Sequence, residues 1–288
     1  MQHKFEITEA PHGFVFKPAG VGPYPAVVLL HVSLGGWGDY WNEKDAPNWL
    51  VGLQTRTAKF AEYLATNGIV TYHAPYFHAG EIHHLKNKIP DELVNVPLEI
   101  TSNAIAWLRE QEYTLDKVGI FGASRGAERA LLVSTLNKGA EKPDVIVAAS
   151  PAAQAVTGFA TWQADSIRKG VEPDFLDSIH SWTFQQEIIK VGTAINFQEL
   201  SQPMLYFYFT PDPIWEGHDK VQAIHKSLNS TEYQIEEDET PLIAMQDDLI
   251  GINFKFAGHS FADPTNKPKL NAFQKELILK FFKIKLSI

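Results

Sequence analysis

Short apolar segments recur along the chain and are separated by longer stretches in which apolar residues return at helical spacing. Within each short segment nearly every residue is apolar, without the strict alternation of a strand that has one face in water. Strands buried on both faces of a parallel sheet have this continuous apolar character. The pattern therefore predicts strands of a parallel sheet at residues 26–31, 69–73, 118–121, 145–149 and 204–209.

Helical spacing is found in three longer stretches, at residues 55–67, 98–111 and 125–137. Gly68 ends the first of them, as glycine commonly does just after a helix. Alternating strands and helices predict an α/β fold with a mostly parallel central sheet and helices on both of its faces. Residues 5–18 are expected to add an antiparallel hairpin at the edge of the sheet.

Residues 151–202 interrupt this alternation. They show mixed spacing and no clear strand pattern, and they hold the large aromatic residues Phe159, Trp162, Trp182, Phe184 and Phe197. We interpret the segment as an excursion over one end of the sheet, in the position of a lid or cap. Extra helices packed against a side of the domain are an equally open interpretation. Because α/β folds of this length often form one domain, residues 1–288 are expected to form a single domain.

The composition narrows the classes of partner. The net charge is −9 and the 34 acidic residues are scattered, whereas nucleic-acid binding requires a concentrated basic surface. The first residues lack the apolar core of a signal peptide, and no segment reaches transmembrane length. We therefore expect a cytoplasmic protein that binds neither nucleic acid nor membranes, with its oligomeric state left open. The absence of cysteine excludes disulfides and a cysteine nucleophile.

The candidate chemistry centres on Gly122-x-Ser124-x-Gly126, which follows a predicted strand and opens a predicted helix. In that context the motif is typical of a nucleophile elbow, a sharp turn that presents a serine hydroxyl above the end of the strand. The amide of Arg125 and the positive end of the helix would then stabilise an oxyanion. The alternative is a serine that merely serves a tight strand-to-helix turn.

A serine nucleophile needs a base, and in this fold the chain order is serine, acid, histidine. His259 follows a late apolar segment, residues 252–256, in a glycine-containing turn, and is the predicted base rather than a surface-loop histidine. Asp212 follows the strand at 204–209 and is the predicted acid, whose role is to hold the imidazole tautomer. Aspartate is also an ordinary turn residue, so Glu216 and Asp238 stay open as substitutes.

A second oxyanion donor is expected in the loop after the first parallel strand, within the segment HVSLGG at residues 31–36. We assign the Ser33 amide to this role, with Val32 and Leu34 open as shifts by one residue. A cluster of His78, Glu81, His83 and His84 does not have the His-Glu-x-x-His spacing of a zinc-protease helix, so no metal site is predicted. Contact of one of these histidines with substrate stays open.

Several motifs together resemble a known family. The elbow reads GASRGAE at residues 122–128, with a basic residue after the serine, and it is preceded by APYF at 74–77, VPLE at 96–99 and AWL at 106–108. Downstream, DPIW at 212–215 and AGH at 257–259 complete the pattern. The chain resembles the C-terminal domain of acyl-CoA thioesterases and bile acid-CoA:amino acid N-acyltransferases, which is related to dienelactone hydrolases. The resemblance implies an α/β-hydrolase fold with Ser124, Asp212 and His259 as its triad.

Two departures from that family bear on the substrate. The members that conjugate amino acids use a cysteine nucleophile, so Ser124 favours transfer to water. Residues 239–251 look inserted before the last strand, and HVSLGG differs from the family's usual oxyanion loop.

These features predict a serine hydrolase that cleaves a small acyl thioester or ester through an acyl-serine, without a cofactor. An acyl-CoA thioesterase is the first expectation, and a carboxylesterase or a dienelactone-type hydrolase is the alternative. A catalytically inactive binding protein with the same fold is the alternative from another class.

Overall fold

The structure is a computed structural model that describes residues 5–11, 13–33, 48–74, 92–160, 162–163, 166, 171, 174–212, 228, 230–236, 241–256 and 268–286. Within the first and last helices, side chains are described from residue 57 and from residue 269 onward.

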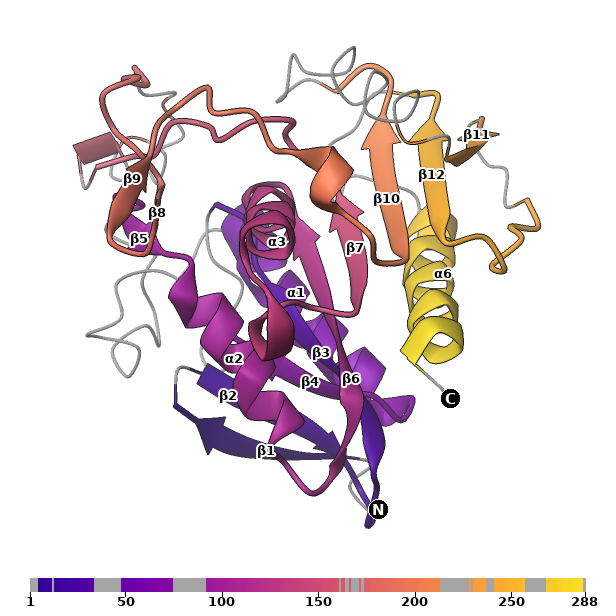
Figure 1. Cartoon of the computed structure of the whole chain (residues 1–288). Coiled ribbons are helices and arrows are strands. Elements are labelled where there is room, and N and C mark those ends of the chain that lie inside the picture. Colours follow the sequence, from indigo (N-terminus) through magenta and orange to yellow (C-terminus); the bar gives the residue numbers. More distant parts are fainter. Residues whose placement is uncertain are drawn as a thin grey trace.

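A nine-stranded sheet forms the centre of the fold, in the order β1-β2-β4-β3-β6-β7-β10-β12-β11 (Figure 1). Its strands from β4 to β11 run parallel, whereas β2 is antiparallel to both β1 and β4. The strands are β1 Phe5–Ala10, β2 Gly13–Pro18, β3 Tyr24–Leu30, β4 Val70–His73, β6 Thr114–Ala123, β7 Val145–Ala149, β10 Met204–Phe209, β11 Thr231–Ile235 and β12 Leu249–Phe254.

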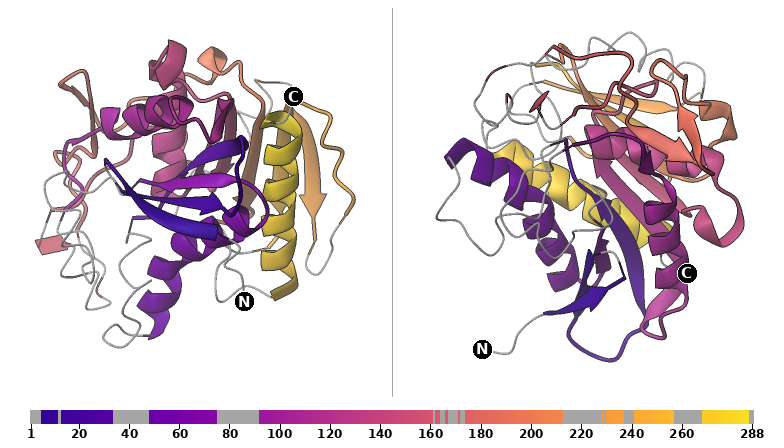
Figure 2. Two further views of the ribbon diagram at one scale, coloured as in Figure 1. Left: turned by 90° about the horizontal axis from the view of Figure 1, so that it is seen from below. Right: turned by 90° about the vertical axis from the view of Figure 1, so that its left-hand side faces the viewer.

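Helices cover both faces of this sheet. Figure 2 shows α1 (Asn48–Thr66) and α6 (Pro268–Leu286) on one face, with α2 (Glu99–Arg109) and α3 (Arg125–Leu136) on the other. Successive residues of a strand point to opposite faces, so Val28 of β3 packs with α2 and α3 while Val27 packs with α1 and α6. Burial on both faces explains why these strands are continuously apolar. Two short 3-10 helices, η2 (Gly139–Glu141) and η3 (Phe197–Glu199), lie in the connections.

The predicted α/β architecture is confirmed. Each strand expected from an apolar segment is present to within a few residues, and residues 5–18 form the expected edge hairpin. In the main sheet and its covering helices, two elements were not predicted: α6, and the edge strand β11, whose sequence TEYQI is half polar and mostly not buried. Residues 249–251 looked like part of an insertion, but they belong to β12.

The segment at 151–202 contains strands that the sequence pattern did not indicate. β8 (Trp182–Phe184) pairs with β5 (Val96–Pro97) in parallel and with β9 (Glu187–Ile189) in antiparallel fashion, forming a small second sheet. Strands of two or three residues are too short to produce a recognisable periodicity. The chain leaves the end of β7, passes through this small sheet and returns past α3 to the start of β10 (Figure 1). Its role as a lid stays a prediction.

None of the helices in the described part of the chain is both long enough and apolar enough to cross a bilayer.

The unpredicted helix α6 is expected to be essential for stability, because Phe282 is buried against β6. Its ring reaches to 2.8 Å from the position that a Cβ on Gly119 would occupy. Phe282→Ala should therefore lower the free energy of unfolding by about 3–5 kcal/mol, measured by urea denaturation. The control Ile284→Ala, on the same helix and 46% exposed, should cost less than about 1 kcal/mol. Equal losses for the two variants would contradict the packing of α6.

Candidate active site

Ser124 lies at the turn between β6 and α3, at the carboxyl edge of the sheet. Its backbone angles are φ 52° and ψ −116°, a conformation that residues other than glycine rarely adopt. The Ser124 N–H donates to the Ala149 carbonyl at 2.8 Å, and the Ser124 carbonyl accepts from the N–H groups of Ala127 and Glu128 at 2.9 and 3.1 Å. Neighbouring structure therefore holds an unfavourable backbone in place, which is a recurrent feature of functional residues.

The two glycines of the motif are required by close backbone contacts. A Cβ on Gly122 would overlap the Gly126 carbonyl, because the turn folds the helix start back over the strand. A Cβ on Gly126 would lie 2.5 Å from the His31 carbonyl oxygen and 2.7 Å from that of Leu30. The end of β3 is thus in contact with the first turn of α3. Gly-x-Ser-x-Gly here has the geometry of a nucleophile elbow.

The two predicted oxyanion donors come from the elements that meet at this contact. Arg125 is the first residue of α3, and N–H groups in the first turn of a helix point out of its N-terminal end. Ser33 is half-buried and follows His31 by two residues, so it lies just beyond the part of β3 that abuts Gly126. Their pairing as donors to an oxyanion stays a prediction.

Asp212 lies three residues beyond β10, at the same edge of the sheet as Ser124. Phe207 of β10 is in register with Ala149 of β7, which is in register with Ala123 of β6. The carboxyl ends of these parallel strands therefore face the same side. Asp212 is half-buried, and one strand, β7, lies between the strand that precedes its loop and the strand that ends at the elbow.

Polar contacts fix the start of the loop that carries Asp212. The Thr210 N–H donates to the Phe254 carbonyl at 2.8 Å, and its hydroxyl donates to Oδ1 of buried Asn253 at 2.8 Å. The Asn253 amide in turn donates to Glu232 at 3.4 Å, and the Tyr208 hydroxyl donates to the same carboxylate. Burial and this carboxylate raise the pKa of Tyr208 well above its usual range.

The predicted base, His259, lies outside the described residues, as do the substitute acids Glu216 and Asp238 and the amide alternative Leu34. The cluster of His78, Glu81, His83 and His84 lies outside them too. Within the part of the chain that the structure describes, no three histidine, aspartate or glutamate side chains gather as a metal site would require.

A buried ion pair lies in the first turn of α3, directly after the elbow. Nη1 of Arg125 is 2.9 Å from Oε2 of Glu128, and both side chains are almost completely buried. The other carboxylate oxygen of Glu128 accepts from the Trp182 indole N–H at 2.7 Å and from the Val156 N–H at 2.9 Å. Burial raises the pKa of Glu128, and Arg125 and the two N–H donors oppose part of that rise.

Further contacts extend from the two arginines of α3. The Arg125 guanidinium donates to the Thr157 carbonyl at 2.8 Å and to the Ser181 hydroxyl at 3.4 Å. Ser181 donates to the Val156 carbonyl at 2.8 Å. This bond joins the stretch around Val156 to the stretch that leads into β8. Arg129 donates to Thr101 at 2.7 Å, and its guanidinium lies 4.9 Å from the centre of the Trp182 ring.

Sequence reasoning did not find this network. Arg125 and Glu128 do pair locally within the helix, but their other partners in this network lie 28 to 56 residues away in the sequence. The available signal was the presence of three charged residues, Arg125, Glu128 and Arg129, in a helix predicted to pack against the sheet. Charged groups are rarely buried without partners, so such a helix indicates polar contacts elsewhere.

His31 and His73 form a second buried polar group, at the ends of β3 and β4. Their rings stack with centroids 6.1 Å apart. Nδ1 of His31 is 2.7 Å from the Val32 carbonyl, and a carbonyl only accepts, so Nδ1 carries the proton. Burial, followed by the proximity of His73, lowers the pKa of His31 well below its usual range. His31 is therefore a neutral residue beside the loop in which the second oxyanion donor is predicted.

Comparison with known proteins identifies the fold. No protein-family model matches the sequence, and no curated protein matches it. A protein from Klebsiella pneumoniae assigned as a dienelactone hydrolase has a similar structure, with a TM-score of 0.58, 15% identity and coverage of 96% of this chain and 97% of its own.

Two esterase structures are also similar. Thermogutta terrifontis esterase 2, phosphonylated by sarin, has a TM-score of 0.54 at 14% identity, covering 98% of this chain and 95% of its own. Esterase B from Lactobacillus rhamnosis has a TM-score of 0.53 at 14% identity, covering 98% and 85%. The chain therefore shares the α/β-hydrolase fold with these proteins, which confirms the predicted fold.

The backbone strain at Ser124 is testable without an assay of activity. Glycine adopts φ 52° without strain, so Ser124→Gly should be more stable than Ser124→Ala by about 1 kcal/mol. Ser134, in the interior of α3, is the control: there the glycine variant should be less stable than the alanine variant by about 1 kcal/mol. Both differences are measured by urea denaturation. If the glycine variant were less stable than the alanine variant at position 124 as well as at position 134, the Ser124 backbone would be unstrained.

The buried His31 should make the protein sensitive to mild acid. Since its pKa is lower in the folded than in the unfolded chain, the unfolded chain takes up the proton first as the pH falls. Below the ordinary histidine value of about 6.5, stability should fall by up to about 1.4 kcal/mol per pH unit. In His31→Gln the slope of stability against pH should be smaller by an amount that corresponds to uptake of about one proton. Urea denaturation between pH 7 and 5 measures this slope. An unchanged slope would contradict a neutral buried His31.

Proposed function

We propose that this protein is a serine hydrolase of carboxylic esters, acting through an acyl-enzyme on Ser124. The observation that carries the proposal is the backbone of Ser124, held at φ 52° between β6 and α3 by glycines that no other residue could replace. A strained backbone of this kind, at a serine between two glycines that meet backbone atoms, is a recurrent feature of functional sites. The fold shared with esterases supports the same chemistry.

In the proposed acylation, the Ser124 hydroxyl oxygen attacks the carbonyl carbon of the ester while His259 takes the hydroxyl proton. Asp212 orients His259 and stabilises its imidazolium form. The tetrahedral oxyanion accepts hydrogen bonds from the amides of Arg125 and Ser33. His259 then gives its proton to the leaving alcohol or thiol, and the carbon–oxygen or carbon–sulfur bond breaks.

In deacylation, water takes the place of the leaving group. His259 removes a proton from the water as it attacks the acyl carbon, and the same amides stabilise the second oxyanion. Collapse of this intermediate returns the proton to Ser124 and releases the carboxylic acid. The side chains and water supply every proton and electron pair, so the proposal requires no cofactor.

The acyl donor has two candidates. The structural comparisons name esterases and a dienelactone hydrolase, and they favour oxygen esters. The elbow sequence GASRGAE at 122–128 resembles acyl-CoA thioesterases and favours thioesters. One fold serves both substrates, so loops rather than architecture decide between them. We place short oxygen esters first.

A fluorophosphonate probe tests the nucleophile, and matched substrates test the donor. The wild type should be labelled at Ser124, and Ser124→Ala should lose labelling and at least about 1,000-fold in kcat/KM. Ser150 is the control for labelling, since it also is buried, follows a neighbouring strand and has a positive φ of 49°. Ser150→Ala should still be labelled. Rates with p-nitrophenyl esters and acyl-CoA of equal chain length then identify the preferred donor.

Other results would contradict the proposal. Labelling that survives in Ser124→Ala would place the nucleophile elsewhere. A wild type that neither reacts with the probe nor hydrolyses either series, yet gains thermal stability with acyl ligands, would be a binding protein.

A further inference from the structure

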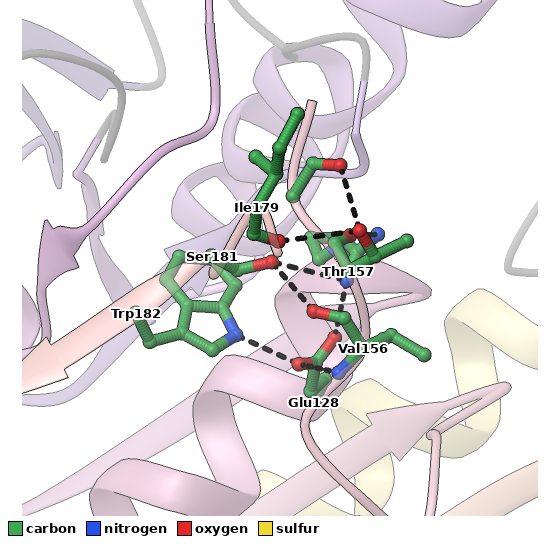
Figure 3. Close-up of polar contacts among 8 residues, drawn as sticks. Glu128, Val156, Thr157, Ile179, Ser181 and Trp182 are labelled. Atoms are coloured by element: carbon green, nitrogen blue, oxygen red, sulfur yellow. Dashed lines mark hydrogen bonds and ion pairs between the residues drawn. The ribbon is translucent and has the colours of Figure 1, made fainter. Parts of the chain in front are cut away.

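Glu128 connects the proposed nucleophile to the segment at 153–184 through two different parts of the same residue. Its backbone N–H donates to the Ser124 carbonyl at 3.1 Å and so helps to close the elbow. One oxygen of its carboxylate binds Arg125. The other oxygen accepts from Val156 and Trp182 (Figure 3). No water-exposed surface remains on this side chain. Movement of the segment is therefore transmitted directly to the turn that holds Ser124.

Arg125 also connects the proposed nucleophile to the 153–184 segment. It directly follows Ser124, and its guanidinium is fixed by Glu128, by the Thr157 carbonyl and by the Ser181 hydroxyl. Thr157 and Ser181 lie on two separate stretches of the segment, and the pairing of β5 with β8 holds the second of these stretches. A guanidinium bound at three points restricts the residue whose amide is the proposed oxyanion donor.

We propose that Glu128 is a positioning residue for the proposed acyl transfer: through Arg125, Val156 and Trp182 it uses the 153–184 segment to align the Arg125 amide with the oxyanion. This inference rests on the proposed function. Alignment matters because a misplacement of about 1 Å in a catalytic group can cost about 100-fold in rate. The segment is accordingly a fixed support of the elbow at this point and not a freely hinged lid.

The alternative is that the pair serves stability alone. Breaking a buried ion pair is strongly destabilising in many proteins, so loss of stability does not separate the two roles. The separating readout is the division between kcat and KM. An amide that binds only the oxyanion acts in the transition state, so its misalignment lowers kcat and leaves KM nearly unchanged.

The test compares Glu128→Gln with Asp144→Asn. Glutamine keeps the shape and an oxygen that can accept from Val156 and Trp182, but it removes the charge that binds Arg125. Asp144 is the matched control: it pairs with Arg109 at 2.8 Å and accepts from the Val118 N–H at 2.8 Å, but it lies at the opposite end of the strands. Trp182→Phe is a second variant, because it removes one donor to Glu128 while keeping an aromatic ring beside the Arg129 guanidinium. Kinetics with a p-nitrophenyl ester are measured at a temperature at which each variant is folded.

We expect Glu128→Gln to lower kcat by about 10- to 100-fold with KM within about 3-fold, and Trp182→Phe to lower kcat less, in the same direction. Asp144→Asn should keep its kcat within about 2-fold. Amide hydrogen exchange provides a readout that needs no activity. It should become faster at residues 153–160 and 176–184 in both Glu128→Gln and Trp182→Phe, and not in Asp144→Asn.

Other results would contradict the positioning role, the connection to the segment or the proposed function. Faster exchange with an unchanged kcat would overturn the positioning role and leave Glu128 as a structural anchor. Unchanged exchange in Glu128→Gln and in Trp182→Phe would overturn the connection itself. An inactive wild type whose Ser124 is not labelled by a fluorophosphonate would overturn the proposed function and the positioning role with it, while exchange would still report whether Glu128 holds the segment.

Discussion

The contact of three backbone stretches at Gly122 and Gly126 is the constraint on which the candidate site depends. The end of β6 turns into α3 so sharply that the first helical turn lies against the strand, and the carbonyls at the end of β3 lie against Gly126. A side chain at either glycine would force β3, β6 and α3 apart. Because the strands are parallel, this contact also brings the loop after β3 to the edge at which Ser124 emerges.

Buried charged residues on α3 connect the 153–184 segment to the elbow. Arg125, Glu128 and Arg129 are all buried, and removing them from water is costly unless hydrogen bonds and opposite charges replace the solvent. The replacements come from the 153–184 segment, including the Trp182 ring and indole N–H, from Thr101 of α2 and from the Pro97 carbonyl of β5. A helix that packs one face on the sheet thus uses its polar residues to fix the small sheet above it. Charge on α3 therefore specifies where that segment lies.

The acyl donor depends on features that the fold does not supply. Esterases, dienelactone hydrolases and acyl-CoA thioesterases share one sheet order and one kind of elbow, because both serve the same acyl-serine chemistry. Their differences lie in loops and insertions at the carboxyl edge of the sheet. In this chain the corresponding connections are the loop after β3, the 151–202 segment after β7 and the loop after β10.

The sequence by itself determined the parallel sheet, its edge hairpin and the elbow, because each rests on local patterns. Continuous apolar segments report strands buried on two faces, and glycines at fixed offsets from Ser124 report a turn that tolerates no side chain. Only the tertiary structure decided what contacts Glu128 and Trp182, how β5 pairs with β8 across 86 residues, and that β11 extends the sheet. Those contacts join residues far apart in the sequence, and two- or three-residue strands and buried polar pairs have no period that a single sequence reveals. Local sequence patterns thus determine where helices and strands form. Buried charges and strand pairing between distant residues determine which of these elements contact one another.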